Sequence, residues 1–290
     1  MSTLFCFGLG YSAEAVARRL SQAGWTISGT CRSEHGCARL AGLGYDMHMF
    51  DGSGVTDGAE RALSEATHVL VSVPPGAMGD PVLRVWRRAL ETMPRLQWIG
   101  YLSTIGVYGD HEGAWVDEET VPTPCNDRSR WRLEAERSWL DLGAMTGTRT
   151  QVFRLAGIYG PGRSAIDNIL DGTARRIVKP GQVFNRIHAE DIASAVEAVI
   201  MRGGSYTIYN VTDDEPAPPQ DVVAFAAALL GRPAPPDVLF DTASLSPMAR
   251  SFYAENKRVR NERMKADLGV TLIYPTYREG LAHLASLVGR

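Results

Sequence analysis

Apolar residues in the first half of the chain recur in short runs that are separated by amphipathic stretches. Short apolar runs bounded by turn residues are typical of buried strands, whereas apolar positions three and four residues apart indicate helices. Strands are predicted over 3–7, 25–31, 45–50, 68–73, 98–103 and 150–155, and helices over 13–20, 82–93 and 128–142. This alternation predicts an α/β fold with a Rossmann-type, doubly wound parallel sheet.

The pattern changes beyond Gly160, where helices follow one another with fewer strands between them. Helices are predicted near 165–176, 189–201, 220–230, 256–268 and 277–288, with one strand over 206–211. We therefore predict a dinucleotide-binding domain over 1–160, completed by about 187–211. The remaining segments, 161–186 and 212–290, are predicted to form a small C-terminal substrate lobe.

Composition excludes several classes of protein for this chain. The 290 residues carry 33 acidic and 30 basic side chains, so no global charge attracts nucleic acid or an anionic membrane surface. No apolar run approaches the roughly 20 residues of a membrane span, and the first residues lack the basic stretch of a signal peptide. Four cysteines are too few and too scattered for a disulfide framework, so a reduced cytoplasmic protein is expected.

The basic residues are distributed unevenly, because the chain has only three lysines, Lys179, Lys257 and Lys265. The first 178 residues contain none. Any mechanism that needs a lysine amine from that part of the chain is excluded.

A glycine-rich turn, Gly8-Leu9-Gly10-Tyr11-Ser12-Ala13, joins the first predicted strand to the first predicted helix. In this context G-x-G-x-x-A is a dinucleotide-binding fingerprint. Gly8 permits the tight turn, Gly10 lets the backbone approach a pyrophosphate, and Ala13 allows close helix packing. Tyr11 and Ser12 begin the helix whose N-terminus attracts the phosphates. The alternative is a glycine-rich turn that binds nothing.

The end of the second strand bears on which dinucleotide is bound. NAD sites usually carry an acidic residue there for the ribose 2′-hydroxyl, and a methyltransferase would also require one. This chain instead has Arg32, flanked by Thr30 and Ser33. A guanidinium can bind a 2′-phosphate bidentately, so NADP is favoured over NAD, with an ordinary surface arginine as the alternative.

Two further segments are predicted to contact the cofactor. Asp51 follows the third strand and is either a hydrogen-bond acceptor for an adenine amino group or a plain turn aspartate. Val73-Pro74-Pro75 ends the fourth strand, because proline cannot continue a ladder, so the chain turns where the cofactor would lie.

Five segments resemble one family in order along nearly the whole chain. They are Leu102-Ser103-Thr104-Ile105-Gly106-Val107-Tyr108-Gly109, Arg154-Leu155-Ala156-Gly157-Ile158-Tyr159-Gly160-Pro161-Gly162, Ile187-His188-Ala189-Glu190-Asp191-Ile192-Ala193, Tyr209-Asn210-Val211 and Asp267-Leu268-Gly269. The chain resembles the extended and atypical short-chain dehydrogenases/reductases, also called the NAD-dependent epimerase/dehydratase family. The resemblance implies a Rossmann domain, a small substrate lobe and hydride transfer between them.

The resemblance also implies a Ser or Thr together with a Tyr-x-x-x-Lys pair. Thr104 matches the former and is our catalytic candidate, with a strand-end cap as the alternative; the adjacent Ser103 is assigned to the cofactor site. Aligning the family's helix on residues 133–136 places Arg128 at the tyrosine position and Arg132 at the lysine position. Arg132 keeps a positive charge for the cofactor ribose, but arginine cannot cycle as an acid/base near neutral pH.

Other titratable groups inside the family motifs are Tyr108, Tyr159 and His188, each expected to serve packing or turn structure rather than catalysis. In this family the segment around His188 and Asp191 mainly fixes the neighbouring helix and the substrate lobe. The arginines proposed to bind a substrate carboxylate or phosphate are Arg128, Arg163 and Arg186. Two functions stay open: an oxidoreductase or epimerase-like enzyme on a polar, anionic small molecule, and an inactive dinucleotide-binding sensor or scaffold.

Two remaining features are weak evidence for a metal site and for a nucleic-acid site. Cys31, His35 and Cys37 offer three ligands without an evident fourth, so no metal is predicted. The basic stretch 256–265 is expected to be a solvated helix rather than a nucleic-acid site. A homodimer is expected from the family's tendency to pair through helices.

Overall fold

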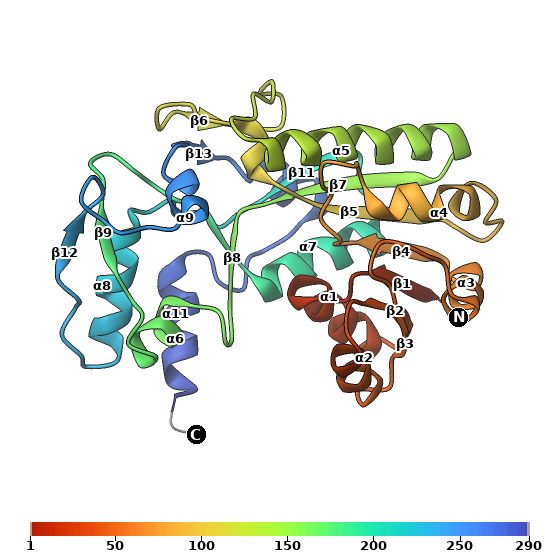
Figure 1. Cartoon of the computed structure of the whole chain (residues 1–290), viewed down its shortest axis with the longest axis horizontal. Helices are drawn as coiled ribbons and strands as arrows, with labels where there is room; N and C mark the ends of the chain where they lie inside the picture. The colour runs from red at the N-terminus through yellow and green to blue at the C-terminus, as the bar shows by residue number, and fades with distance from the viewer. Residues whose placement is uncertain (1, 289–290) are drawn as a thin grey trace.

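A seven-stranded parallel sheet forms the centre of the computed structural model, which describes residues 2–288 (Figure 1). The order along the sheet is β11-β7-β5-β4-β1-β2-β3. The strands are β1 (Thr3–Phe7), β2 (Thr26–Cys31), β3 (Asp46–Met49), β4 (His68–Val71), β5 (Trp98–Thr104), β7 (Arg149–Leu155) and β11 (Ile208–Val211). The strand order reverses between β1 and β4, as in Rossmann-type folds. The predicted α/β fold class is confirmed.

Helices cover both faces of this sheet. On one face lie α1 (Tyr11–Gln22), α2 (Glu34–Ala41) and α7 (Ala189–Arg202); on the other lie α3 (Asp57–Ser64), α4 (Pro81–Glu91) and α5 (Asp127–Thr146). Successive side chains of a strand point to opposite faces. Accordingly, Leu4 and Cys6 of β1 pack with the first group, whereas Phe5 and Phe7 pack with the second. Burial on both faces explains the uninterrupted apolar runs.

Helices α2 and α3 were not predicted, because each spans only eight residues and α2 buries a single residue, Leu40. Both begin at a side-chain cap. The Ser33 hydroxyl accepts from the Gly36 N–H at 3.1 Å, and the Thr56 hydroxyl accepts from the Ala59 N–H at 3.4 Å. The polar residues that looked like loop sequence are therefore helix starts.

The remaining elements form a smaller lobe around α6 (Ala165–Leu170), α8 (Pro219–Leu229) and α11 (Tyr277–Ser286), which pack on one another. Short parallel strand pairs complete it: β8 (Gly157–Tyr159) with β10 (Arg186–His188), β9 (Arg176–Val178) with β12 (Asp237–Leu239), and β6 (Trp115–Val116) with β13 (Arg258–Val259). Helix α9 (Pro247–Phe252) lies between β12 and β13 in the chain.

Two predicted helices are shorter than expected. The helix predicted over 165–176 ends at Leu170, because Gly172 adopts φ +67° and the chain turns into β9. The helix predicted over 256–268 begins only at Glu262, as α10 (Glu262–Leu268). Its first six residues instead hold β13, and Lys257 and Asn261 are buried, so the predicted solvated basic helix is wrong there.

The segment around Asp191 fixes the second lobe, as expected. The Asp191 carboxylate is buried and accepts from the N–H groups of Ile273 at 2.6 Å and Tyr274 at 3.1 Å. Helix α7 therefore holds the chain that leads into α11.

The cysteines differ from the expectation of four reduced thiols. A disulfide joins Cys31, at the end of β2, to Cys37 of α2, with 5.7 Å between their Cα atoms. The unpredicted helix α2 is the reason, because its first turns bring Cys37 back over the strand end. Cys6 and Cys125 are free thiols.

Candidate functional site

The glycine turn brings β1 against the end of β4. Gly8 has φ +78°, and a Cβ there would lie 2.8 Å from Val73 Cγ2, so only glycine fits. The Gly8 N–H donates to the Thr30 hydroxyl of β2 at 2.9 Å. Gly10 differs, because its ideal Cβ would meet nothing nearer than the Gly8 carbonyl oxygen at 4.0 Å. The space above Gly10 is open.

The N-terminus of α1 offers free hydrogen-bond donors at this turn. Gly10 precedes the helix and provides no side-chain cap, and the Glu14 N–H donates to the Gly10 carbonyl at 2.7 Å. The amides before Glu14 belong to the unsatisfied first turn of the helix. Ser12 and Ala13 are buried against the sheet, whereas the Tyr11 hydroxyl donates to the Pro161 carbonyl at 3.1 Å.

The residues predicted to bind the adenosine end lie on the loops after β2 and β3. Arg32 is exposed and has no hydrogen-bond or ion-pair partner within residues 2–288, so its guanidinium is available to a ligand. The Ser33 hydroxyl caps α2, and the buried Thr30 hydroxyl holds the glycine turn; both side chains thus have structural roles that the sequence did not show. The Asp51 carboxylate accepts from the Ser53 N–H at 2.9 Å, and this bond and one from the Ser53 hydroxyl lower the pKa of Asp51.

The loop that ends β4 lies beside this turn. The strand ends at Val71, and half-buried Val73 packs against Gly8, followed by exposed Pro74 and half-buried Pro75. The loop therefore runs next to the glycine turn at the carboxyl edge of the sheet, where the strand order reverses. Ligands of open α/β sheets bind at such a switch point.

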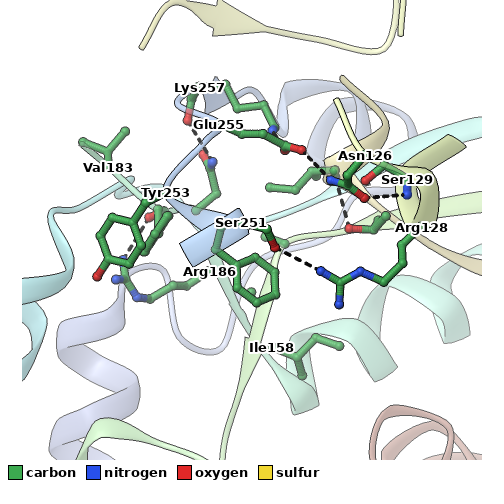
Figure 2. A pocket seen from close by; sticks show the side chains of 18 of the residues that line it. Asn126, Arg128, Ser129, Ile158, Val183, Arg186, Ser251, Tyr253, Glu255 and Lys257 are labelled. Atoms are coloured by element: carbon green, nitrogen blue, oxygen red, sulfur yellow. Dashed lines mark hydrogen bonds and ion pairs between the residues drawn. The ribbon is translucent and has the colours of Figure 1, made fainter. Parts of the chain in front are cut away.

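A cavity of about 680 Å³ continues from the end of β5 toward the second lobe. Its wall includes five of the residues singled out from the sequence: Thr104, Arg128, Arg132, Arg163 and Arg186. Sequence reasoning missed other polar lining residues, namely Asn126, Ser129, Asn185, Ser251, Tyr253, Glu255 and Lys257. Figure 2 shows Arg128 directed at Ser251 on one side of this cavity and Arg186 beside Tyr253 on the other.

Thr104 caps the end of its strand and also lines the cavity. Its hydroxyl oxygen accepts from the Gly106 N–H at 3.1 Å and caps the 3₁₀ helix η1 (Ile105–Tyr108). A hydroxyl has one donor and two lone pairs. The cap uses a lone pair, so the Thr104 O–H remains free to donate into the cavity that it lines.

Arg128 and Arg132 lie one turn apart on α5 and approach different groups. The Arg128 guanidinium donates to the Ser251 hydroxyl at 3.0 Å. Arg132 turns toward β5, donates to the Leu102 carbonyl at 2.8 Å and lies over the Tyr101 ring. Each guanidinium has five N–H donors, so most of its donors stay available to ligands.

Arg163 and Arg186 come from the second half of the chain. Arg163 lies over the ring of Tyr11, 5.6 Å from its centroid, and so connects the cavity with the first residue of α1. Arg186 donates to the Phe184 carbonyl at 2.9 Å and to the Ala217 carbonyl at 3.2 Å. Its burial lowers its pKa from the ordinary value.

The charge of the cavity is strongly unbalanced. Within residues 2–288, none of its four arginines has a carboxylate at ion-pair distance, although ten other arginines have one. Glu255 is the acidic residue of the wall, and it pairs with Lys257 at 2.7 Å. Arg128 and Arg163 are exposed, and Arg132 and Arg186 are half-buried. Because these guanidinium groups have no carboxylate partner among residues 2–288, they are available to an anionic ligand.

Ser103 lies on the other face of the strand end. Its hydroxyl is buried and donates to Glu136 at 2.5 Å, and it does not line the cavity. Tyr108 is likewise outside the cavity, and its hydroxyl donates to the Asn210 side chain at 2.8 Å. Burial raises the pKa of Tyr108, so this side chain is suited to packing rather than to proton transfer.

His188 and Tyr159 also have structural surroundings. The His188 Nδ1 atom accepts from the Glu190 N–H at 3.2 Å, and burial lowers the pKa of His188 to about 4. Tyr159 lines the cavity, but its hydroxyl donates to the Thr276 carbonyl at 3.4 Å, and burial raises its pKa. Neither group combines cavity access with a pKa near neutrality.

In the part of the chain from residue 2 to 288, no three His, Cys, Asp or Glu side chains are grouped as metal ligands. None of the helices described there is long and apolar enough to cross a membrane.

Three known families or proteins are similar to this chain. The NAD dependent epimerase/dehydratase family matches residues 76–212. Protein YeeZ of Escherichia coli strain K12 is 28% identical over 220 residues, which are 73% of this chain and 77% of YeeZ. A solved structure of a functionally unknown conserved protein from Silicibacter pomeroyi is 48% identical over 100% of both chains, with a TM-score of 0.90.

A more distant structure shares the fold. UDP-glucuronic acid 4-epimerase from Bacillus cereus, in complex with NAD, has a TM-score of 0.75 at 14% identity and matches 99% of this chain and 96% of its own. Fold and site together define a Rossmann-type α/β protein with a cationic cavity at the carboxyl edge of its sheet. The match over residues 76–212 and the shared fold relate the chain to the NAD-dependent epimerase/dehydratase family.

Proposed function

We propose that this chain is an NADP(H)-dependent oxidoreductase or epimerase-like enzyme acting on a polar, anionic small molecule. The observation that carries the proposal is the set of four cavity arginines without carboxylate partners within residues 2–288. A volume of about 680 Å³ is in the range of small-molecule sites. An inactive sensor would not require an open, cationic cavity beside the predicted cofactor site.

The residues of the glycine turn fit a dinucleotide. Open space above Gly10 admits a pyrophosphate, and the unsatisfied amides at the start of α1 face that space with the positive end of the helix dipole. The exposed, unpartnered Arg32 suits a ribose 2′-phosphate, which favours NADP over NAD. Bound NADP(H) would supply or accept a hydride. Arg132, at the inner end of the site, would hold the nicotinamide ribose.

Substrate binding is assigned to the opposite part of the cavity. Arg128, Arg163 and Arg186 would bind carboxylate or phosphate oxygens, to which arginine donates bidentately. Thr104 would donate its free O–H to the oxygen at the reacting carbon. Because arginine stays protonated, Arg128 orients and neutralises the substrate but transfers no proton.

The test combines binding and turnover. NADPH binding is measured by its fluorescence, and NADPH absorbance is followed with sugar nucleotides, hydroxy acids and keto acids. Arg128→Ala is expected to raise the KM of an accepted substrate by about tenfold or more, the value of a lost charged hydrogen bond. Arg130→Ala is the matched control, because Arg130 lies on the same helix, is exposed and pairs with Asp127. Absence of NADPH binding would reject the cofactor assignment, and NADPH binding without turnover of any compound would favour the sensor.

A further inference from the structure

Lys257 is an unusual lysine. Only 5% of its surface is exposed, although lysine is almost never fully buried, and it lines the cavity. It lies between α9 and β13, far in sequence from the Rossmann domain that it contacts. Of the three lysines in the chain, it alone reaches the cavity.

The backbone at this position is held on both sides by one buried side chain. The Asn185 Nδ2 group donates to the Lys257 carbonyl at 3.0 Å, and the Asn185 Oδ1 atom accepts from the Val259 N–H at 2.8 Å. Asn185 itself lines the cavity. This arrangement fixes the Lys257 backbone at the cavity wall.

The ammonium group is positioned by two acceptors. It donates to the Gly109 carbonyl at 2.7 Å and to Glu255 Oε2 at 2.7 Å. Glu255 Oε1 in turn accepts from Asn126 Nδ2 at 3.0 Å, and Figure 2 shows these three side chains along one wall. An ammonium has three donors, and within residues 2–288 the third has no acceptor.

We propose that Lys257 binds the substrate directly, donating its third N–H to an oxygen of the anionic ligand, with Glu255 and Asn126 as positioning residues. That this ligand is the substrate rests on the proposed function. Lys257 thereby supplies an ammonium group from the second lobe. The basic residues of α5, on the other side of the site, are all arginines. A purely structural role, in which the ion pair only fastens residues 255–257 to Gly109, is the competing explanation.

The experiment uses citrate as the anionic probe, titrated calorimetrically into the full chain at low ionic strength. Lys257→Met removes the charge at similar length, Lys257→Gln keeps one donor group for Gly109, and Lys257→Arg keeps the charge. Lys179→Met is the matched control, because the Lys179 ammonium also donates to a backbone carbonyl, that of Tyr253, but Lys179 does not line the cavity. NADPH affinity is measured in parallel for every variant.

Citrate affinity is expected to fall by about tenfold or more in Lys257→Met and Lys257→Gln, the size of a lost charged hydrogen bond. It should stay within about threefold of wild type in Lys257→Arg, and Lys179→Met should match wild type. Unchanged citrate affinity in the folded Met or Gln variant, an equal loss in Lys179→Met, or no citrate binding to wild type would overturn the inference. If wild type does not bind NADPH but the citrate affinities of the variants differ as expected, the proposed function is rejected and Lys257 remains an anion-binding residue.

Discussion

The Glu136 carboxylate and the Arg154 guanidinium form an ion pair at 2.8 Å, with only 1% and 3% of their side chains exposed. Ser103 donates to the same carboxylate, and the Arg154 guanidinium lies over the Tyr108 ring, 4.8 Å from its centroid. One buried network therefore joins α5, β5 and β7, and it includes Ser103, the residue before Thr104. It fixes the helix that presents Arg128 and Arg132 to the cavity.

Removing one member of this pair should destabilise the protein strongly, because the other charge stays buried without a partner. Glu136→Ala is expected to lower the free energy of unfolding by about 3–5 kcal/mol. Glu134→Ala, at an exposed position of the same helix, should change it by no more than about 0.5 kcal/mol. Urea denaturation followed by circular dichroism measures both, and equal small effects would contradict the assigned role of the pair.

The two glycines of the turn should separate cofactor binding from stability. Gly10→Ala is expected to weaken NADPH binding by about tenfold or more, since φ is −97° and the methyl group enters only the open space assigned to the pyrophosphate. Gly8→Ala should lower the free energy of unfolding by about 1–3 kcal/mol, because φ is +78° and the methyl group meets Val73. Fluorescence titration and thermal denaturation give the two quantities. Full NADPH affinity in the Gly10→Ala variant would argue against pyrophosphate binding here.

Arg32 should discriminate between the two dinucleotides. Arg32→Ala is expected to raise the NADPH dissociation constant by about 10- to 100-fold and to leave that of NADH unchanged, because only NADPH carries the 2′-phosphate. Arg39→Ala serves as control, since Arg39 is also on the α2 side of the site but pairs with Glu14 at 2.7 Å. Wild-type protein that binds NADH as tightly as NADPH would contradict the assignment.

Local sequence signals predicted the sheet and the residues at its carboxyl edge. The run 3–7, the glycine turn and the apolar face of α1 are contiguous, so neighbouring residues alone reveal them. Arg128 and Arg132 were placed by their spacing on one helix, and both line the cavity. Ser33 shows the limit of such reasoning, because a hydroxyl after a strand can bind phosphate or start a helix, and here it caps α2.

The opposite wall of the cavity was not predictable in the same way. Lys257 lies 148 residues beyond Gly109 and Glu255 lies 129 residues beyond Asn126. Long-range contacts, including the pairing of β13 with β6 and the bonds of Asn185, bring them together. The basic composition of 256–265 suggested a solvated helix, since no local pattern shows that Lys257 is buried. The Glu136–Arg154 pair was missed for a related reason. Arg154 lies on the strand predicted over 150–155 and Glu136 on the helix predicted over 128–142, and no local pattern shows that the two side chains meet.

His188 should make stability depend on pH below neutrality. Burial, with a smaller effect from the positive charge of His283, lowers its pKa from 6.5 to about 4. Between these values the unfolded chain binds more protons than the folded one, so the free energy of unfolding falls as the pH falls. From pH 7 to pH 5 this residue alone should cost about 2 kcal/mol.

His188→Asn tests this contribution, because asparagine can still cap α7 by accepting from the Glu190 N–H. The variant should lose about 2 kcal/mol less than wild type between pH 7 and pH 5, whatever its stability at pH 7. His68, whose pKa is also lowered to about 4 by burial, is present in both proteins and cancels in the comparison. Urea denaturation at the two pH values measures the difference, and identical pH dependence in the two proteins would show that His188 titrates normally in the folded state.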